Sequence, residues 1–278
     1  MRRLLLILLV AAAGLGLFGY GQAMQDPRIV RYTVPVQGLE QPLRIVQLSD
    51  SHASAIDMPP QRLQRVVAMM NALKPELVVL SGDYLSGNPG DWSASETRAA
   101  LAPFASLRAP LGVLAVVGNH DSRKATRAAL ASTRVRVLIG ERITVGPLTL
   151  VGADSYLRGS EAVEQMRRLV RQAPAGRPVL VLAHEPDFFQ WLQARPVVMI
   201  AGHTHGGQIR LPFIGGLLVS DYARSRLRGV FHERGSTLVV SSGLGSSLLP
   251  VRLGVPPEIV LVTLVPVHSV GRKSGTER

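Results

Sequence analysis

Short continuous runs of Val, Leu and Ile alternate with longer amphipathic stretches from residue 43 to residue 266. Such runs are typical of strands that are buried on both faces of a sheet. Between the first two runs, Leu63, Val66, Met70 and Leu73 recur at helical spacing. The pattern therefore predicts a layered α/β domain. The expected strands are 43–48, 77–80, 113–117, 148–151, 179–182, 197–200, 237–240 and 259–264, and the expected helices are 63–73, 97–107, 124–131, 162–171 and 188–192.

The N-terminus has a different pattern, with Arg2 and Arg3 before an uncharged apolar run, residues 4–20. A short basic region before such a run indicates a membrane anchor or a secretory signal peptide. The Gly-Gln-Ala segment at 21–23 offers a cleavage site, so both interpretations stay open. With the arginines in the cytoplasm, the rest of the chain would be exported. The expected organisation is an anchor or signal at 1–24, a linker and entry segment at 25–42, a catalytic domain at 43–266 and a flexible tail at 267–278.

Composition narrows the classes of protein. At 46% hydrophobic and 18% charged residues, the 278-residue chain is neither disordered nor fibrous. It has no cysteine, which excludes disulfides, thiolate metal sites and a cysteine nucleophile. The net charge of +12 suggests an anionic partner, although an arginine-rich codon bias explains it equally well. Aromatic residues make up only 5%, so nucleic acid is not the expected partner.

Polar residues that can bind metals follow the predicted strands directly. Five of the seven histidines occupy such positions. The carboxyl ends of parallel strands meet at one edge of a sheet, where ligands bind. Carboxylate, imidazole and amide donors without sulfur suit Mn²⁺, Fe, Zn²⁺ or Mg²⁺, and a carboxylate can bridge two such ions about 3.5–4 Å apart. The candidate residues are Asp50, His52, Asp83, Asn119, His120, Asp121, His184, His203 and His205.

This ordered series resembles the calcineurin-like metallophosphoesterase superfamily over residues 43–266. Residues 202–209 (GHTHGGQI), together with the segment from Gly243 to Ile259, are similar to its bacterial membrane-anchored branch. That branch is commonly linked to phosphodiesterase activity, and some relatives hydrolyse the pyrophosphate of UDP-2,3-diacylglucosamine in lipid A synthesis. The resemblance thus implies an enzyme in the bacterial inner membrane, held through residues 4–20, or a periplasmic one if the signal is cleaved.

The resemblance also implies a four-layer α/β/β/α sandwich, two divalent ions and a role for each candidate residue. One ion would be held by Asp50, His52 and His205, and the other by Asn119, His184 and His203. Asp83 would bridge the two ions, and a hydroxide between them would attack phosphorus. His120 would protonate the leaving oxygen, oriented by Asp121. Three positions depart from the family pattern, namely Ser51, the Ser122-Arg123 pair and Ser242.

Arginines between the last metal motif and the strand at 237–240 alternate with apolar residues. They predict either a basic, partly apolar lip that binds a phosphorylated lipid, or a hairpin with a solvated arginine face. The leading hypothesis is a phosphoesterase that acts on a phosphodiester or pyrophosphate carried by a membrane lipid. The alternatives are an enzyme for soluble nucleotides or nucleic acid, and a catalytically silent, metal-dependent binder of membrane surfaces. The candidate substrate-binding residues are Arg123, Arg224, Arg226, Arg228 and Arg252.

Overall fold

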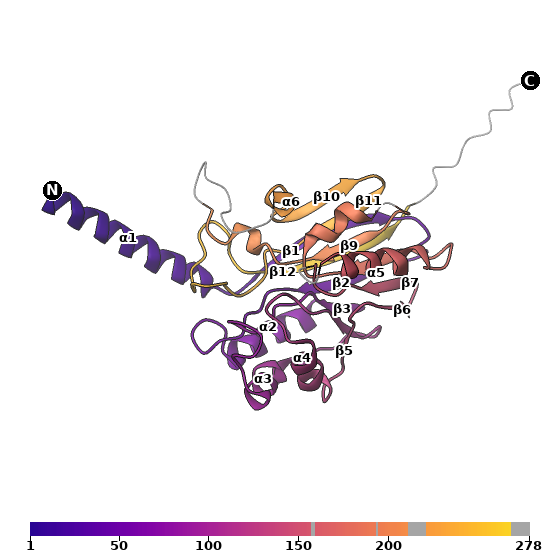
Figure 1. Cartoon of the computed structure of the whole chain (residues 1–278), viewed down its shortest axis with the longest axis horizontal. Helices are drawn as coiled ribbons and strands as arrows, with labels where there is room; N and C mark the ends of the chain where they lie inside the picture. Colours follow the sequence, from indigo (N-terminus) through magenta and orange to yellow (C-terminus); the bar gives the residue numbers. More distant parts are fainter. Residues whose placement is uncertain (157–158, 193, 211–220, 268–278) are drawn as a thin grey trace, which may run out of the picture.

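The computed structural model describes residues 1–156, 159–192, 194–210 and 221–267, which form two stacked sheets with helices outside them (Figure 1). The predicted tail, apart from its first residue, and the apolar part of the predicted lip at 211–220 lie outside the described residues. Each sheet has six strands. The first has the order β1 (Arg28–Val36), β12 (Glu258–Pro266), β2 (Leu43–Leu48), β3 (Leu77–Leu80), β4 (Val113–Ala115) and β5 (Val135–Val137). The second has the order β10 (Gly229–Glu233), β11 (Ser236–Val240), β9 (Val198–Ala201), β8 (Val179–Leu182), β7 (Leu148–Gly152) and β6 (Glu141–Val145).

Three apolar clusters separate four layers. A central core, with Ile45, Val79, Leu180 and Ile200, lies between the two sheets. A second core joins the first sheet to helices on its outer face, and a third joins the second sheet to helices on the opposite side. The first group of helices is α2 (Pro60–Ala72), α3 (Ala94–Leu101), η1 (Ala102–Ser106) and α4 (Arg123–Leu130), and the second is α5 (Ser160–Arg171) and η3 (Pro186–Trp191). The predicted α/β/β/α sandwich is confirmed.

Local signals explain where the helices on the first sheet begin and end. α2 begins with Pro60. Proline suits the first helical turn, because an N–H there has no acceptor within the helix and its absence costs no hydrogen bond. Ser93 and Glu96 form a capping box at the start of α3. α3 was expected to continue to residue 107. It gives way to a 3₁₀ turn at Ala102 instead, because Pro103 cannot donate an α-helical hydrogen bond.

The segment 25–42 is a correction to the predicted organisation, because it contains a strand rather than only a linker. β1 pairs in parallel with β12, from Arg28 beside Glu258 to Val36 beside Pro266. A strand of the first sheet therefore begins at Arg28, before the predicted start of the catalytic domain at residue 43. Other differences are small. β5, β6 and β10 were not among the predicted strands, β4 ends at Ala115, and the segment expected as a helix at 188–192 is the 3₁₀ helix η3.

The apolar N-terminal run forms α1 (Arg2–Ala23), which projects from the domain (Figure 1). It is long and apolar enough to cross a membrane, and its most apolar window is only 6% buried. Its carboxyl end is different, since Gly19 and Ala23 are buried against the domain. The guanidinium of Arg62 donates to the carbonyl oxygens of Ala23 and Gln25, each at 2.7 Å. These contacts fix the end of α1 to the domain.

Candidate metal centre

The predicted ligands come together where strands from both sheets end. Asp50 and His52 follow β2, Asp83 follows β3, and Asn119 follows the β4 segment, all from the first sheet. His184 follows β8, and His203 and His205 follow β9, from the second sheet. Because β2, β3 and β4 are parallel neighbours, as are β8 and β9, their carboxyl ends lie at one edge of the sandwich.

Two groups of three side chains can each hold one divalent ion. The possible ligand atoms of Asp50, His52 and His205 lie within 4.8 Å of one another, as do those of Asp83, His184 and His203. In the first group the Nε2 atoms of His52 and His205 are 3.2 Å apart. In the second, the His203 Nδ1 and His184 Nε2 atoms are also 3.2 Å apart. In each group, the imidazole nitrogens therefore lie close enough together to bind the same ion.

Asp83 faces both groups. Its Oδ2 lies 3.2 Å from Nε2 of His184 and 3.7 Å from Nε2 of His52. A single carboxylate thus stands between the imidazoles of the two groups, as a bridging ligand must. Asn119 completes the second group, since its Oδ1 lies 3.1 Å from Nε2 of His184. The seven ligand positions implied by the sequence resemblance are therefore close neighbours in space.

The backbone is strained at most of these positions. Asp50, His52, Asp83, His203 and His205 all have positive φ, between 40° and 70°. Residues other than glycine rarely adopt this left-handed region, and such strain concentrates at functional sites. The surrounding structure holds the loops in place: the N–H of Asp50 donates to the Gly82 carbonyl and that of His52 to the Asp83 carbonyl. The left-handed backbone at these residues directs their side chains toward the two groups of possible ligand atoms.

Gly118 allows Asp83 to reach its position. A Cβ atom at residue 118 would lie 2.1 Å from Oδ1 of Asp83 and 2.7 Å from its backbone nitrogen. Any side chain there would displace the carboxylate, so the close approach of the loops after β3 and β4 requires glycine.

Burial and neighbouring charges shift the pKa values of the candidate ligands. Burial opposes the charged form of Asp83, but the imidazoles of His184 and His52 outweigh it and lower its pKa. Burial lowers the pKa of His205 to about 3 and also lowers the pKa of His52 and His203, which favours neutral imidazoles able to bind a metal. Burial also works against charge on His184, yet the carboxylate of Asp83 raises its pKa above the usual value.

Asp121 differs from its predicted role. Its carboxylate accepts the backbone N–H groups of Asp83 (2.8 Å), Tyr84 (3.0 Å) and Gly118 (2.8 Å). It therefore orients the loop that carries the bridging Asp83 rather than the ring of His120. Burial and the negative charge of Asp83 raise the pKa of Asp121 to about 7.

His120 stands beside the ligands, outside the two groups. Its backbone N–H donates to Oδ1 of Asp83 at 2.9 Å, and its ring packs edge-on against that of His52, with centroids 5.4 Å apart. Its Nδ1 lies 2.6 Å from the carbonyl oxygen of Gly87. A carbonyl can only accept, so Nδ1 carries a proton and Nε2 is the nitrogen left for substrate.

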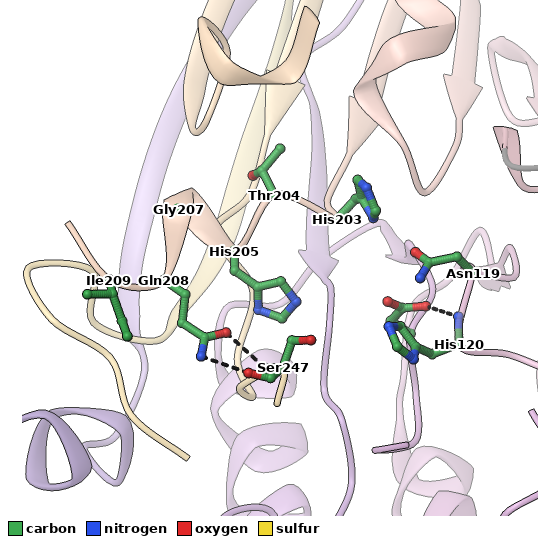
Figure 2. A pocket seen from close by; sticks show the side chains of 10 residues that line it. Asn119, His120, His203, Thr204, His205, Gly207, Gln208, Ile209 and Ser247 are labelled. Atoms are coloured by element: carbon green, nitrogen blue, oxygen red, sulfur yellow. Dashed lines mark hydrogen bonds between the residues drawn. The ribbon is translucent and has the colours of Figure 1, made fainter. Parts of the chain in front are cut away.

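A cavity of about 270 Å³ opens over the centre (Figure 2). Several of its lining residues were not among the predicted site residues. Most of them lie in the 202–209 segment beside His203 and His205 and carry no metal-binding side chain, whereas Ser247 comes from a distant loop. Gln208 connects the two segments, since its side chain is bonded to Ser247. The lining residues are Asp83, Asn119, His120, His203, Thr204, His205, Gly207, Gln208, Ile209 and Ser247.

The five candidate arginines occupy different environments. Arg123 forms an ion pair with Asp154. Arg226 pairs with Glu233 and stacks over the Tyr222 ring at 4.0 Å. Arg224 lies exposed on the short helix α6 (Asp221–Arg224).

Arg252 and Arg228 contrast with each other. Arg252 is fully buried, and its guanidinium donates to the carbonyl oxygens of Gly245, Ser242 and Val255. It therefore holds the loop between β11 and β12. Arg228 is exposed, and its side chain passes beside Gly206 in the metal-ligand loop. Arg228 thus lies close to the loop that carries His205, although it does not line the cavities over the centre.

Divalent ions fit this donor set. Two carboxylates, four imidazoles and an amide oxygen converge without any thiolate, which is the chemistry of Mn²⁺, Fe, Zn²⁺ or Mg²⁺ rather than of soft metals. Two such ions bring four positive charges, and Asp50 and Asp83 offset two of them. The occupied centre would therefore attract a phosphate.

Comparison with known proteins agrees with this geometry. A profile of the family described as calcineurin-like phosphoesterase matches residues 43–207, more than half of the chain. The chain is 31% identical over 237 residues to the uncharacterized metallophosphoesterase YkuE of Bacillus subtilis (strain 168), covering 80% of this chain and 78% of that protein. It is 30% identical over 240 residues to phosphodiesterase YaeI of Escherichia coli (strain K12), covering 81% and 83%. Among solved structures, a dimetal phosphatase from Danio rerio matches with a TM-score of 0.45 and 14% identity over 73% of this chain and 88% of that one.

Proposed function

Because the chain belongs to the calcineurin-like phosphoesterase family and is a metal-dependent phosphoester hydrolase, we propose that it hydrolyses a phosphodiester or pyrophosphate carried on a membrane lipid. The observation that supports a dinuclear reaction is the position of Asp83 between two complete ligand groups. Bound by these residues, two divalent ions would supply Lewis acidity and an activated water.

The side chains of this enzyme then have separate tasks. Asp50, His52 and His205 would hold one ion, and Asn119, His184 and His203 would hold the other. Asp83 joins the groups and fixes the distance between them. With Nδ1 held by the Gly87 carbonyl, the imidazolium of His120 can give the proton on Nε2 to the leaving oxygen. No protein nucleophile is needed.

Membrane attachment supports a lipid-linked substrate. α1 is long and apolar enough to span a bilayer, and its buried carboxyl end contacts the domain. Cleavage at 21–23 would cut through these contacts, so we propose that α1 is retained as an anchor in the bacterial inner membrane, with the domain on the exported side. UDP-2,3-diacylglucosamine, a lipid-linked pyrophosphate, is a candidate substrate of this class.

The test uses the full chain in phospholipid vesicles, stripped with a chelator and reloaded with Mn²⁺, Zn²⁺ or Mg²⁺. We expect metal-dependent hydrolysis of bis(p-nitrophenyl) phosphate, and faster turnover of UDP-2,3-diacylglucosamine in the same vesicles. Hydrolysis of the small diester without any turnover of the lipid would retain the assignment as a phosphodiesterase but reject the lipid-linked substrate class. Absence of both activities in the metal-loaded protein would reject the phosphodiesterase.

Arg228→Ser should raise KM for the lipid substrate and leave the small diester unchanged, which is the pattern of lost uniform binding. Arg226→Ser is the matched control. Arg226 is already paired with Glu233, so its loss should affect both substrates alike or neither. If Arg228→Ser impairs both substrates equally, Arg228 does not contact the lipid part of the substrate.

A further inference from the structure

Three exposed apolar side chains line one side of the catalytic centre. Ile56, Leu248 and Leu249, here called the apolar rim, are 67%, 84% and 61% exposed. Among the described residues beyond Met24, only five large apolar side chains are exposed, and these are three of them. They line a second cavity, of about 320 Å³, together with His52 and His120. The apolar rim thus borders the metal centre.

Neither segment of the apolar rim is loosely held. Gln208 donates through Nε2 to the carbonyl oxygens of Ser247 (2.9 Å) and Leu249 (3.1 Å), and accepts the Ser247 N–H at 2.8 Å. The turn before Met58 is also bonded, because Ser54 Oγ accepts the N–H groups of Ile56 and Asp57. The exposed leucines and isoleucine are therefore presented by ordered loops.

Leu248 also has a strained backbone conformation. Its φ is +64°, in the left-handed region where Gly or Asn is the usual residue. A leucine held in this conformation and exposed to water is unfavourable in both backbone and side chain. The exposure is understandable if the side chain is covered by an apolar phase, and a strained backbone of this kind is typical of functional sites.

The carboxyl end of α1 is attached to the same loop. The N–H of Arg252 donates to the carbonyl oxygen of Gly19 at 3.0 Å. A Cβ atom at residue 19 would lie 2.5 Å from Cγ1 of Val251, so helix and loop are in direct contact. This contact is within a few residues of Leu249. The apolar rim therefore lies near the helix that enters the membrane.

The length of α1 sets the depth of this contact. Residues 4–18 span only about 22 Å at about 1.5 Å per residue, whereas the hydrocarbon core of a bilayer is about 30 Å thick. The apolar helix reaches about 30 Å only if it is counted to Ala23. A spanning α1 must consequently carry Gly19, and the loop bonded to it, into the edge of the bilayer.

We propose that Ile56, Leu248 and Leu249 insert into the leaflet in which the carboxyl end of α1 emerges, so that the catalytic cavity opens directly onto that leaflet. The acyl chains of the bilayer lipids therefore cover the apolar rim. This inference rests on the proposed membrane anchor. A lipid phosphate at headgroup depth would then reach the metal centre without leaving the membrane.

The absence of cysteine allows a direct test with single fluorescent labels. Leu248→Cys, Leu249→Cys and Ile56→Cys of the full chain are each labelled with bimane and reconstituted into phosphatidylethanolamine–phosphatidylglycerol vesicles that contain brominated lipid. Val267→Cys is the matched control, because Val267 is apolar and 53% exposed, and follows the end of β12 that pairs with Val36, remote from α1. Leu9→Cys reports on insertion of α1.

We expect brominated lipid to quench the labels at 248, 249 and 56, and to leave the label at 267 unquenched. Quenching at residue 9 with none at the rim positions would overturn the inference and retain the anchor. An unquenched label at residue 9 would reject the anchor, and with it the basis of the inference.

A second measurement separates insertion from chemistry. The double variant Leu248→Ser, Leu249→Ser should raise KM for the lipid substrate about a hundredfold, since partial burial of each of the two leucines is worth about tenfold. Its turnover of bis(p-nitrophenyl) phosphate should equal that of the unmodified enzyme, because this small diester has no acyl chain for the leucines to bind. An unchanged lipid KM, or equal losses on both substrates, would contradict the role of the apolar rim.

Discussion

Asp83 connects more parts of the centre than any ligand beside it. One of its oxygens faces His52 and His184, and the other accepts the N–H of His120. Its own backbone N–H is held by Asp121. Loops that follow three different strands thus meet at a single carboxylate.

Asp83→Asn should abolish nearly all hydrolysis, because an amide carries no negative charge and has only one oxygen where the carboxylate has two. The loss should exceed the 10–100-fold that removing an outer partner of a ligand typically costs. Metal content by mass spectrometry and turnover of bis(p-nitrophenyl) phosphate provide the measurement. A folded variant with normal turnover would show that Asp83 is not the bridging ligand.

His120→Ala should keep the bound metal and lower turnover by about 10²–10⁴-fold, the usual contribution of a general acid. The loss should be smaller for a p-nitrophenyl leaving group, which departs without a proton, than for an alkyl group. Kinetics on paired aryl and alkyl esters test this. Equal losses on both esters would argue for a role in binding the transition state instead.

The sequence was sufficient to predict that the candidate ligand side chains come together at one edge, and insufficient to predict the contacts that hold their loops. Asp50, Asp83 and His184 each follow a recognisable strand, so the topology of the sheets fixes their edge. The partners of Asp121 were not predictable, because its carboxylate acts on a backbone 38 residues away. The contact between Gln208 and Ser247 depends in the same way on two loops whose approach no local pattern records.

At the scale of elements, β1 and α1 show where patterns of apolar residues lose information. β1 alternates irregularly between exposed and buried positions and contains Pro35, so it reads as a linker. Its partner β12 is more than 200 residues away in the chain, and the pairing is visible only in the fold. α1 was recognisable from its composition, but the contact of Gly19 with Val251 was not.

Gly19→Leu should loosen the contact between α1 and the loop after β11, because a side chain there collides with Val251 and Leu253. Gly16→Leu is a matched control, since nothing lies within 4 Å of its Cβ position. Hydrogen exchange measured in vesicles should become faster at residues 247–253 in the first variant alone. Identical exchange in the two variants would mean that α1 is not held at Gly19.

At the scale of the whole molecule, the metal centre joins the two sheets. One ligand group combines Asp50 and His52 of the first sheet with His205 of the second, and the other combines Asp83 with His184 and His203. A bound ion therefore contributes to the cohesion of the sandwich, and the metal-free protein must keep carboxylates and imidazoles buried without it.

Divalent ions should consequently raise the thermal unfolding midpoint, and a chelator should lower it. An ion at about 100 times its Kd stabilises the folded state by about 2.7 kcal/mol. Calorimetry of the chelated and reloaded protein measures the shift, and His203→Ala should reduce it. A midpoint that is indifferent to metal would contradict the proposal that ions join the sheets.

Folding of the first sheet must wait for β12, which lies between β1 and β2 in the strand order. Pairing of such distant segments is slow, because a long loop has to close before any contact forms.

β12 also completes the centre, since the Glu258 carboxylate accepts the Ser242 N–H at 2.7 Å and the Glu258 N–H donates to the Gly243 carbonyl beside Asp50. A nascent chain whose anchor is already inserted should therefore stay protease-sensitive and unable to retain metal until residues 258–266 arrive, which pulse proteolysis of chains stalled before and after β12 would reveal. Hydrolysis would then begin only once synthesis of the domain is complete and the enzyme is already at its site of action.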